Sequence, residues 1–144
     1  MGVDADIFAL KVDKACDIDR LDNLQSAEWY HTEESKEIEQ LKAEATYGGK
    51  VSAAKMLRLA TLCKKVYEDV LEGRVTGEQV EWMAEDEDRL LGKIYWMDCL
   101  IMFVKRYPED EFMLVNDHEE RWYDMWEPHK REDLIDWPTW KKAR

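Results

Sequence analysis

The sequence has few of the residues that usually build catalytic or metal centres. Its 144 residues include three cysteines and three histidines, Cys16, Cys63, Cys99, His31, His118 and His129. None of them falls in a CxxC, HxH or HExxH spacing. GxSxG, P-loop and Rossmann glycine patterns are also missing, and Gly48–Gly49 is too short to surround a phosphate. We therefore expect no catalytic motif, no metal and no cofactor, with a metal site built from distant residues as the alternative.

The cysteines are odd in number and far apart, which is typical of free thiols in a reducing compartment. Cys63 is followed by Lys64 and Lys65, whose charges could lower the pKa of its thiol. Consecutive residues point in different directions on a helix, however, so the sequence favours a buried, unreactive thiol.

A signal peptide and a membrane span are not evident either. The first residues, MGVDADIFALKVDK, hold acids where a signal peptide needs bases. The apolar runs are shorter than the ~20 residues that a spanning helix requires. We expect a cytoplasmic protein.

Acidic residues dominate the charge, because 33 Asp and Glu face 21 Lys and Arg, for a net charge of −12. Residues 129–144 carry five basic and three acidic side chains, so the first 128 carry 16 and 30, a net charge of −14. Such a body repels nucleic-acid phosphates and anionic lipids. The charge favours a protein partner with a basic surface over direct nucleic-acid or membrane binding.

The most hydrophobic stretch runs from Gly92 to Pro108, and between Ile94 and Val104 only Asp98 is neither apolar nor aromatic. A segment that is hydrophobic on nearly every side is a buried helix when it is too short to span a membrane. Asp98 would then need a partner, because an unpaired buried carboxylate costs several kcal/mol. It is either a structural acid held by Arg, Tyr or the N–H of a Trp, or a catalytic acid.

Periodicity predicts an α+β fold that is mostly helical, with a central buried helix, further helices packed on it and a small antiparallel sheet. The alternative is an all-α bundle. We expect one acidic globular domain, residues 1–128, and a basic tail containing Trp, residues 129–144. The predicted elements are strands over 3–12 and 111–116, and helices over 17–24, 26–46 in one or two pieces, 52–72, 77–107 and 117–126. The helix over 77–107 can run unbroken, and the alternative is a break near 85–88 or at Gly92.

Four acids recur at spacings of three and four on the predicted helix over 77–107: Glu78, Glu81, Glu85 and Asp88. At about 100° per residue they share an arc of about 80°. They could steer a basic partner or mimic a row of phosphates. The alternative is an ordinary solvated helix face.

Tryptophan is abundant, with seven residues in the chain. Trp is typical of interface hot spots, so we expect Trp122, Trp126, Trp137 and Trp140 to anchor a partner. The tail that holds the last two is too apolar to remain free in solution. It docks on its own domain, or on a partner or second copy.

The start MGVD before a strand, and the small, acidic, Trp-rich body, resemble small phage-encoded accessory proteins. The resemblance implies stoichiometric binding to a host enzyme in the host cytoplasm. The leading hypothesis is a non-enzymatic inhibitor or modulator. The alternatives are a small enzyme using Asp98, His31 or His118, and a structural protein that self-associates through its tail.

Overall fold

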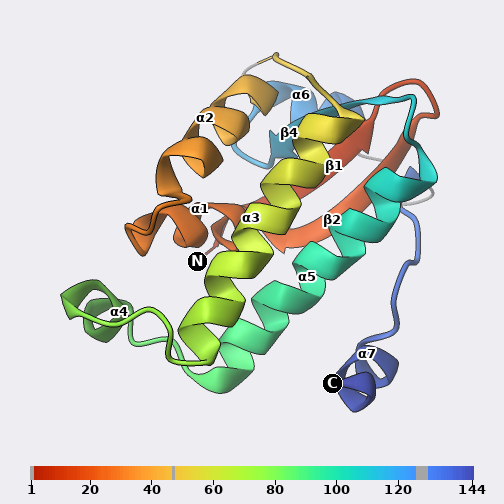
Figure 1. The fold of residues 1–144 in the computed structure, drawn as a ribbon. Coiled ribbons are helices and arrows are strands. Elements are labelled where there is room, and N and C mark those ends of the chain that lie inside the picture. Colours follow the sequence, from red (N-terminus) through yellow and green to blue (C-terminus); the bar gives the residue numbers. More distant parts are fainter. Residues whose placement is uncertain (1, 47, 126–129) are drawn as a thin grey trace.

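The computed structural model describes residues 2–46, 48–125 and 130–144, and it confirms a mostly helical α+β fold (Figure 1). Trp126 and His129 lie outside the described part. No helix in the described part is long and apolar enough to cross a membrane. The elements are β1 (Asp4–Ala9), β2 (Lys14–Arg20), α1 (Asp22–Trp29), α2 (Ser35–Ala45), β3 (Val51–Ser52), α3 (Ala53–Leu71), α4 (Glu78–Met83), α5 (Glu87–Arg106), β4 (Glu111–Asn116), α6 (Glu120–Met125) and α7 (Trp137–Ala143).

The sheet is antiparallel throughout, in the order β2-β1-β4-β3. The predicted pairing of the first strand with 111–116 is confirmed, since Ile7 lies opposite Leu114. β1 is central, and all five of its residues from Ala5 to Ala9 are buried. Burial on both faces explains why its sequence does not keep one alternation of apolar and polar residues.

The predicted helix over 17–24 is wrong, because residues 14–20 form β2 and the helix α1 begins at Asp22. Ile18 shares the buried face of the strand with Cys16, whereas Leu24 belongs to α1. A left-handed residue, Asp19 with φ 65°, lies near the end of β2. The spacing of three residues between apolar side chains therefore came from the end of β2 and the start of α1, and not from one helix.

Two hydrophobic clusters cover the two faces of the sheet. On one face, Ile7 and Leu114 pack with the helices α1, α2, α3 and α5. On the other, Phe8 and Val115 pack with Trp122 of α6. Figure 1 shows the four longer helices on one side of the sheet and α6 behind it.

Helices α3 and α5 lie side by side (Figure 1) and together supply half of the buried residues of the main core. α3 matches the helix predicted over 52–72, and the hydroxyl of Ser52 accepts from the N–H of Lys55 as its N-cap. α5 carries the hydrophobic stretch around Ile94, and one side of it is buried as predicted, whereas Tyr95, Trp96 and Met102 are only partly buried. The predicted helix over 77–107 is divided at 84–86, where Ala84 is left-handed (φ 48°) and Asp86 caps α5.

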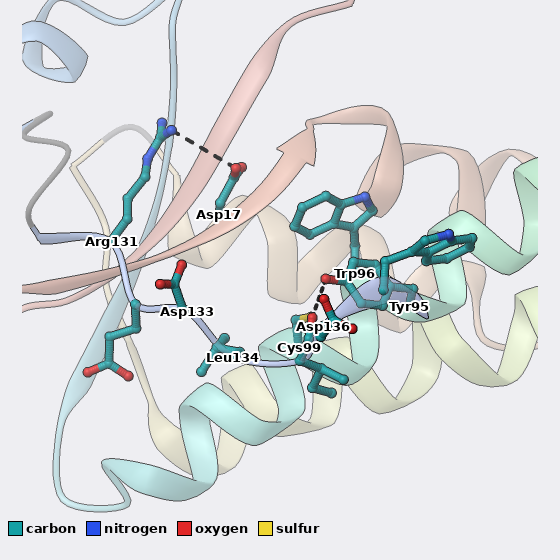
Figure 2. A pocket seen from close by; sticks show the side chains of 11 residues that line it. Asp17, Tyr95, Trp96, Cys99, Arg131, Asp133, Leu134 and Asp136 are labelled. Atoms are coloured by element: carbon teal, nitrogen blue, oxygen red, sulfur yellow. Dashed lines mark hydrogen bonds and ion pairs between the residues drawn. The ribbon is translucent and has the colours of Figure 1, made fainter. Parts of the chain in front are cut away.

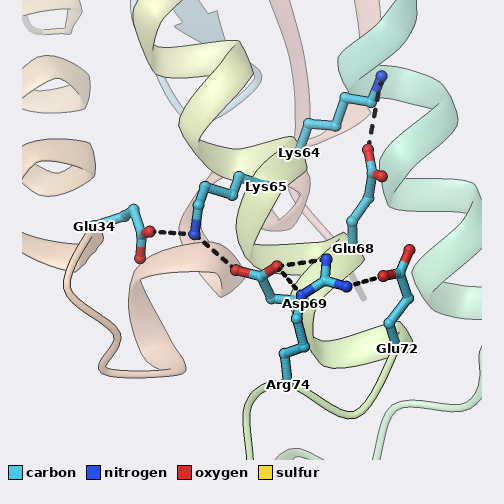
Figure 3. A network of polar contacts seen from close by, with 7 residues as sticks. All are labelled: Glu34, Lys64, Lys65, Glu68, Asp69, Glu72 and Arg74. Carbon is cyan, nitrogen blue, oxygen red and sulfur yellow. Dashed lines mark hydrogen bonds and ion pairs between the residues drawn. The ribbon is translucent and has the colours of Figure 1, made fainter.

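An ion-pair network ties the exposed side of α3 to neighbouring loops (Figure 3). Lys65 bridges Glu34 and Asp69 at 2.6 and 2.8 Å. Asp69 also accepts from Arg74 at 2.7 Å, beyond the end of the helix. The network fixes the turn from which the chain leaves α3 toward α4.

Candidate functional site

The predicted acidic stripe lies on two helices instead of one. Glu78 and Glu81 belong to α4, Asp88 belongs to α5, and Glu85 lies in the break between them. Glu78, Glu81 and Asp88 are exposed. The common arc expected for one continuous helix therefore does not form, because the left-handed Ala84 redirects the chain.

Glu85 faces the body of the protein. It is ion-paired with Lys93 and accepts a 2.9 Å hydrogen bond from the hydroxyl of Tyr30. Lys93 also donates to the hydroxyl of Ser26 at 2.7 Å. These contacts anchor the base of a projecting segment, and burial together with Glu85 raises the pKa of Tyr30.

We call residues 77–88 the acidic arm. The segment holds six acidic side chains and no Lys, Arg or His. It leads away from the α3–α5 pair before returning to it (Figure 1). Trp82 stands on it with 75% of its surface exposed, while Val80 and Met83 pack partly against the core.

The tryptophans predicted as partner anchors lie mainly inside the fold. Trp122 and Trp140 are 7% and 8% exposed, so neither offers a surface anchor in this conformation. Trp137 is half-buried and stacks on Trp140 with ring centroids 5.4 Å apart. Among the described residues, the exposed indoles are those of Trp82 and Trp29, which the sequence did not single out.

Asp98 is held as a structural acid. Its Oδ2 accepts a 2.8 Å hydrogen bond from the indole Nε1 of Trp140, and its Oδ1 pairs with Lys64 at 2.7 Å. The N–H of a Trp is one of the partners that the sequence predicted for Asp98. The hydrogen bond from Trp140 places the tail on α5. Self-association through the tail stays a prediction.

The two described histidines do not join Asp98 in a cleft. His31 and His118 are exposed, at the end of α1 and after β4. Asp98 instead borders a shallow groove that Met102 and Ile135 also line, and neither His31 nor His118 reaches it. The acid–base arrangement proposed for an enzyme therefore lacks its geometric basis.

All three cysteines are buried and free. Burial raises the pKa of the Cys63 thiol, and the same holds for Cys16 and Cys99. The buried, unreactive thiol favoured by the sequence is confirmed for Cys63, and Lys64 and Lys65 point to carboxylates of other residues instead of activating it.

One spacing typical of metal ligands, Glu28-x-x-His31, does occur in the sequence. Glu28 is paired with Lys42 at 2.7 Å, and His31 is exposed. Within residues 2–46, 48–125 and 130–144, no three His, Cys, Asp or Glu side chains gather as metal ligands. The structure gives this spacing no ligand role.

A cleft of about 580 Å³ lies between β2, α5 and the segment that leads to α7 (Figure 2). This segment, residues 130–136, begins as a parallel bridge from Arg131 to Ala15 at the sheet edge. The hydroxyl of Tyr95 donates to the carbonyl of Ile135 farther along it. The cleft therefore opens where the segment leaves the edge of β2 and crosses to α5.

The charged residues at the cleft are mostly acidic. Asp17, Glu132, Asp133 and Asp136 line it, against one cation, Arg131. Arg131 donates to the buried Asp6 at 2.9 Å and lies 4.0 Å from Asp17. Sequence reasoning missed this site because its residues are far apart in the chain, and only their acidic character was visible beforehand.

In comparisons with known proteins, no family model, curated protein or solved structure gave a significant match to this chain.

Proposed function

We propose that this protein is a non-enzymatic binding module that modulates another protein, and that the acidic arm contacts a basic surface on that partner. The observation that carries the proposal is the position of Trp82. Of the large hydrophobic side chains that the structure describes, Trp82 is the most exposed, and it stands on the segment with six acids and no base. A Trp anchor with a polar rim is typical of specific protein interfaces, and the charge of one sign around Trp82 favours a partner of the opposite charge.

The two components of the arm have different roles. The indole of Trp82 would supply affinity by entering a pocket on the partner, because buried Trp side chains are frequent hot spots. The carboxylates would act mainly on the association rate and on the choice of partner. The exposed acids are Glu78, Glu81, Asp86, Glu87 and Asp88.

The base of the arm is firmly attached, which favours binding. Lys93 and Tyr30 hold Glu85, so the arm starts from a fixed position on α5 and α1. Trp29, 40% exposed, directly precedes Tyr30 and lies next to this anchor in the chain. An arm with an ordered base loses less entropy on binding than a free loop does.

The test is affinity purification from the native host with the full-length protein, followed by mass spectrometry. We expect the full-length protein to capture a specific protein with a basic surface, and we expect the variant Trp82→Ala to lose this capture. The combined variant Glu78→Gln, Glu81→Gln should weaken capture, most strongly at low salt.

The matched controls are Val12→Ala, for an exposed hydrophobic side chain in the turn after β1, and Glu39→Gln, for an exposed acid on α2. Capture that survives both arm variants, or that is equally reduced by the controls, would contradict the proposal. Competition with DNA for the captured partner would separate mimicry of nucleic acid from ordinary protein binding.

A further inference from the structure

The cleft beside α5 has a wall of aromatic rings. Tyr95 and Trp96 of α5 and Trp137 of α7 line it, and the ring of Tyr95 meets the other two edge-on at centroid distances of 5.0 and 5.1 Å. Figure 2 shows Tyr95, Trp96 and Asp136 toward one end, and Arg131, Asp17 and Asp133 toward the other. The lining therefore joins an apolar, π-rich surface to carboxylates.

Several of the charges at the cleft are already neutralised within the protein. Glu132 pairs with Arg106 at 3.0 Å and accepts from the hydroxyl of Tyr107. Arg131 bonds Asp6 and approaches Asp17. Asp133 is exposed, and no described residue forms a hydrogen bond or ion pair with it.

Cationic side chains of the protein itself already lie over its aromatic rings. Lys141 lies over the ring of Trp137 at 5.7 Å, and Arg131 lies over Trp122 at 5.9 Å. A cation is attracted to the face of an aromatic ring, most strongly to Trp. A second cleft, lined by Trp96, Lys93 and Glu85, is different because its three acids are matched by three bases.

We propose that the cleft between β2, α5 and residues 131–137 binds an organic cation, a guanidinium or a primary ammonium on an alkyl chain. The cation pairs with Asp133 and the neighbouring acids, while the alkyl chain lies against Tyr95 and Trp96. A volume of about 580 Å³ is in the range, about 300–1,000 Å³, of small-molecule sites. This proposal does not depend on the acidic arm.

The experiment is a titration of the isotope-labelled full-length protein, followed by NMR signals of backbone and indole N–H groups. The probes are agmatine, as a free cation, and a capped Ala-Arg-Ala peptide, as a basic side chain in a polypeptide. The matched neutral probe is the same peptide with citrulline, which keeps the shape of arginine and removes its charge. We expect saturable shifts at Tyr95, Trp96 and Asp133 with a cationic probe and none with citrulline.

Two variants test the site: each replaces one carboxylate by an amide, one at the cleft and one far from it. Asp133→Asn should weaken binding about three- to fivefold, the effect of losing one partly exposed ion pair. Glu39→Gln on α2 should leave the affinity unchanged, and equal melting temperatures would show that both variants fold. Binding of agmatine would indicate a free cation as ligand, and binding of the peptide alone would indicate a basic side chain.

Equal binding of the arginine and citrulline peptides would overturn the proposal. So would shifts that avoid the cleft, or an equal effect of the two variants.

Discussion

The indole Nε1 of Trp140 donates a 2.8 Å hydrogen bond to Oδ2 of Asp98, which joins the last helix to the middle of α5. Lys64 approaches the other oxygen of the same carboxylate at 2.7 Å, so α3, α5 and α7 meet at one acid. The hydrogen bond is charge-assisted and partly buried, which makes it stronger than an exposed surface contact.

Trp140→Phe should lower the free energy of unfolding by about 1.5–3 kcal/mol, because it removes a hydrogen bond to a charged group. The variant should also speed trypsin cleavage in α7, where Lys141 and Lys142 are exposed. Urea unfolding and timed proteolysis measure the two effects. Trp137→Phe is the control, since Trp137 is half-buried and stacks without this bond; equal losses in both variants would contradict the assignment.

Asp6 should make stability depend on pH. Burial raises the pKa of its carboxyl from 3.8 to about 6, an effect that Arg131 partly opposes and that Asp17 and Asp4 increase. The folded protein therefore binds this proton more tightly than the unfolded chain does. The resulting contribution is fully present below about pH 4 and is lost as the pH rises through about 6, on the order of 3 kcal/mol.

Asp6→Asn should remove that dependence, because the amide resembles the neutral acid. Relative to the unmodified protein, the variant should gain stability between about pH 4 and pH 6.5, measured by urea unfolding at each pH. Asp4→Asn, an exposed acid on the same strand, is the control. A stability difference that stays constant over this range would rule out titration of Asp6.

Asp110 should stabilise the connection between β1 and β2. Its Oδ1 accepts from the backbone N–H of Lys11 and Glu111 at 2.8 and 2.7 Å, and its Oδ2 accepts from Val12 at 3.1 Å. Asp110→Ala should lower the free energy of unfolding by about 2–4 kcal/mol, because three donors lose a charged acceptor. Glu109→Ala, at an exposed position, should change it by less than about 0.5 kcal/mol.

Two glycines should respond in opposite ways to alanine. A Cβ at Gly49 would lie 2.1 Å from the carbonyl oxygen of Glu44, so Gly49→Ala should destabilise the fold by about 1–3 kcal/mol. A Cβ at Gly92, inside α5, meets nothing within 4 Å. Gly92→Ala should therefore stabilise the protein by about 0.5–1 kcal/mol, and thermal unfolding of both variants would show whether the signs differ.

The sequence predicted the elements whose periodicity is undisturbed. The helix over 52–72 has a wide apolar face, and the strand over 111–116 is bounded at both ends, so both appear as predicted. β2 was missed because its last residues and the start of α1 together imitate one helical face. A break near 85–88 was one of two possibilities that the sequence left open, but the left-handed Ala84 was not foreseen, since an alanine favours a helix and the turn depends on its surroundings.

The candidate sites were predicted less completely. The sequence predicted the type of partner that Asp98 has, the N–H of a Trp among them, because a buried acid needs a hydrogen-bond donor. The exposed Trp82 was not, because nothing local distinguishes an indole that points outward from one that is buried. The cleft depends on residues 17, 95–99 and 131–137 meeting, which is tertiary information that no spacing contains.

The exposure of Trp82 gives the protein an intrinsic optical reporter. Its indole is surrounded by negative charge, so caesium ions should quench its fluorescence more efficiently than iodide does. The buried Trp122 and Trp140 are shielded from both ions. In a Trp29→Phe background, which removes the second exposed indole of the described residues, loss of the caesium-sensitive signal would follow occupation of the arm without a label.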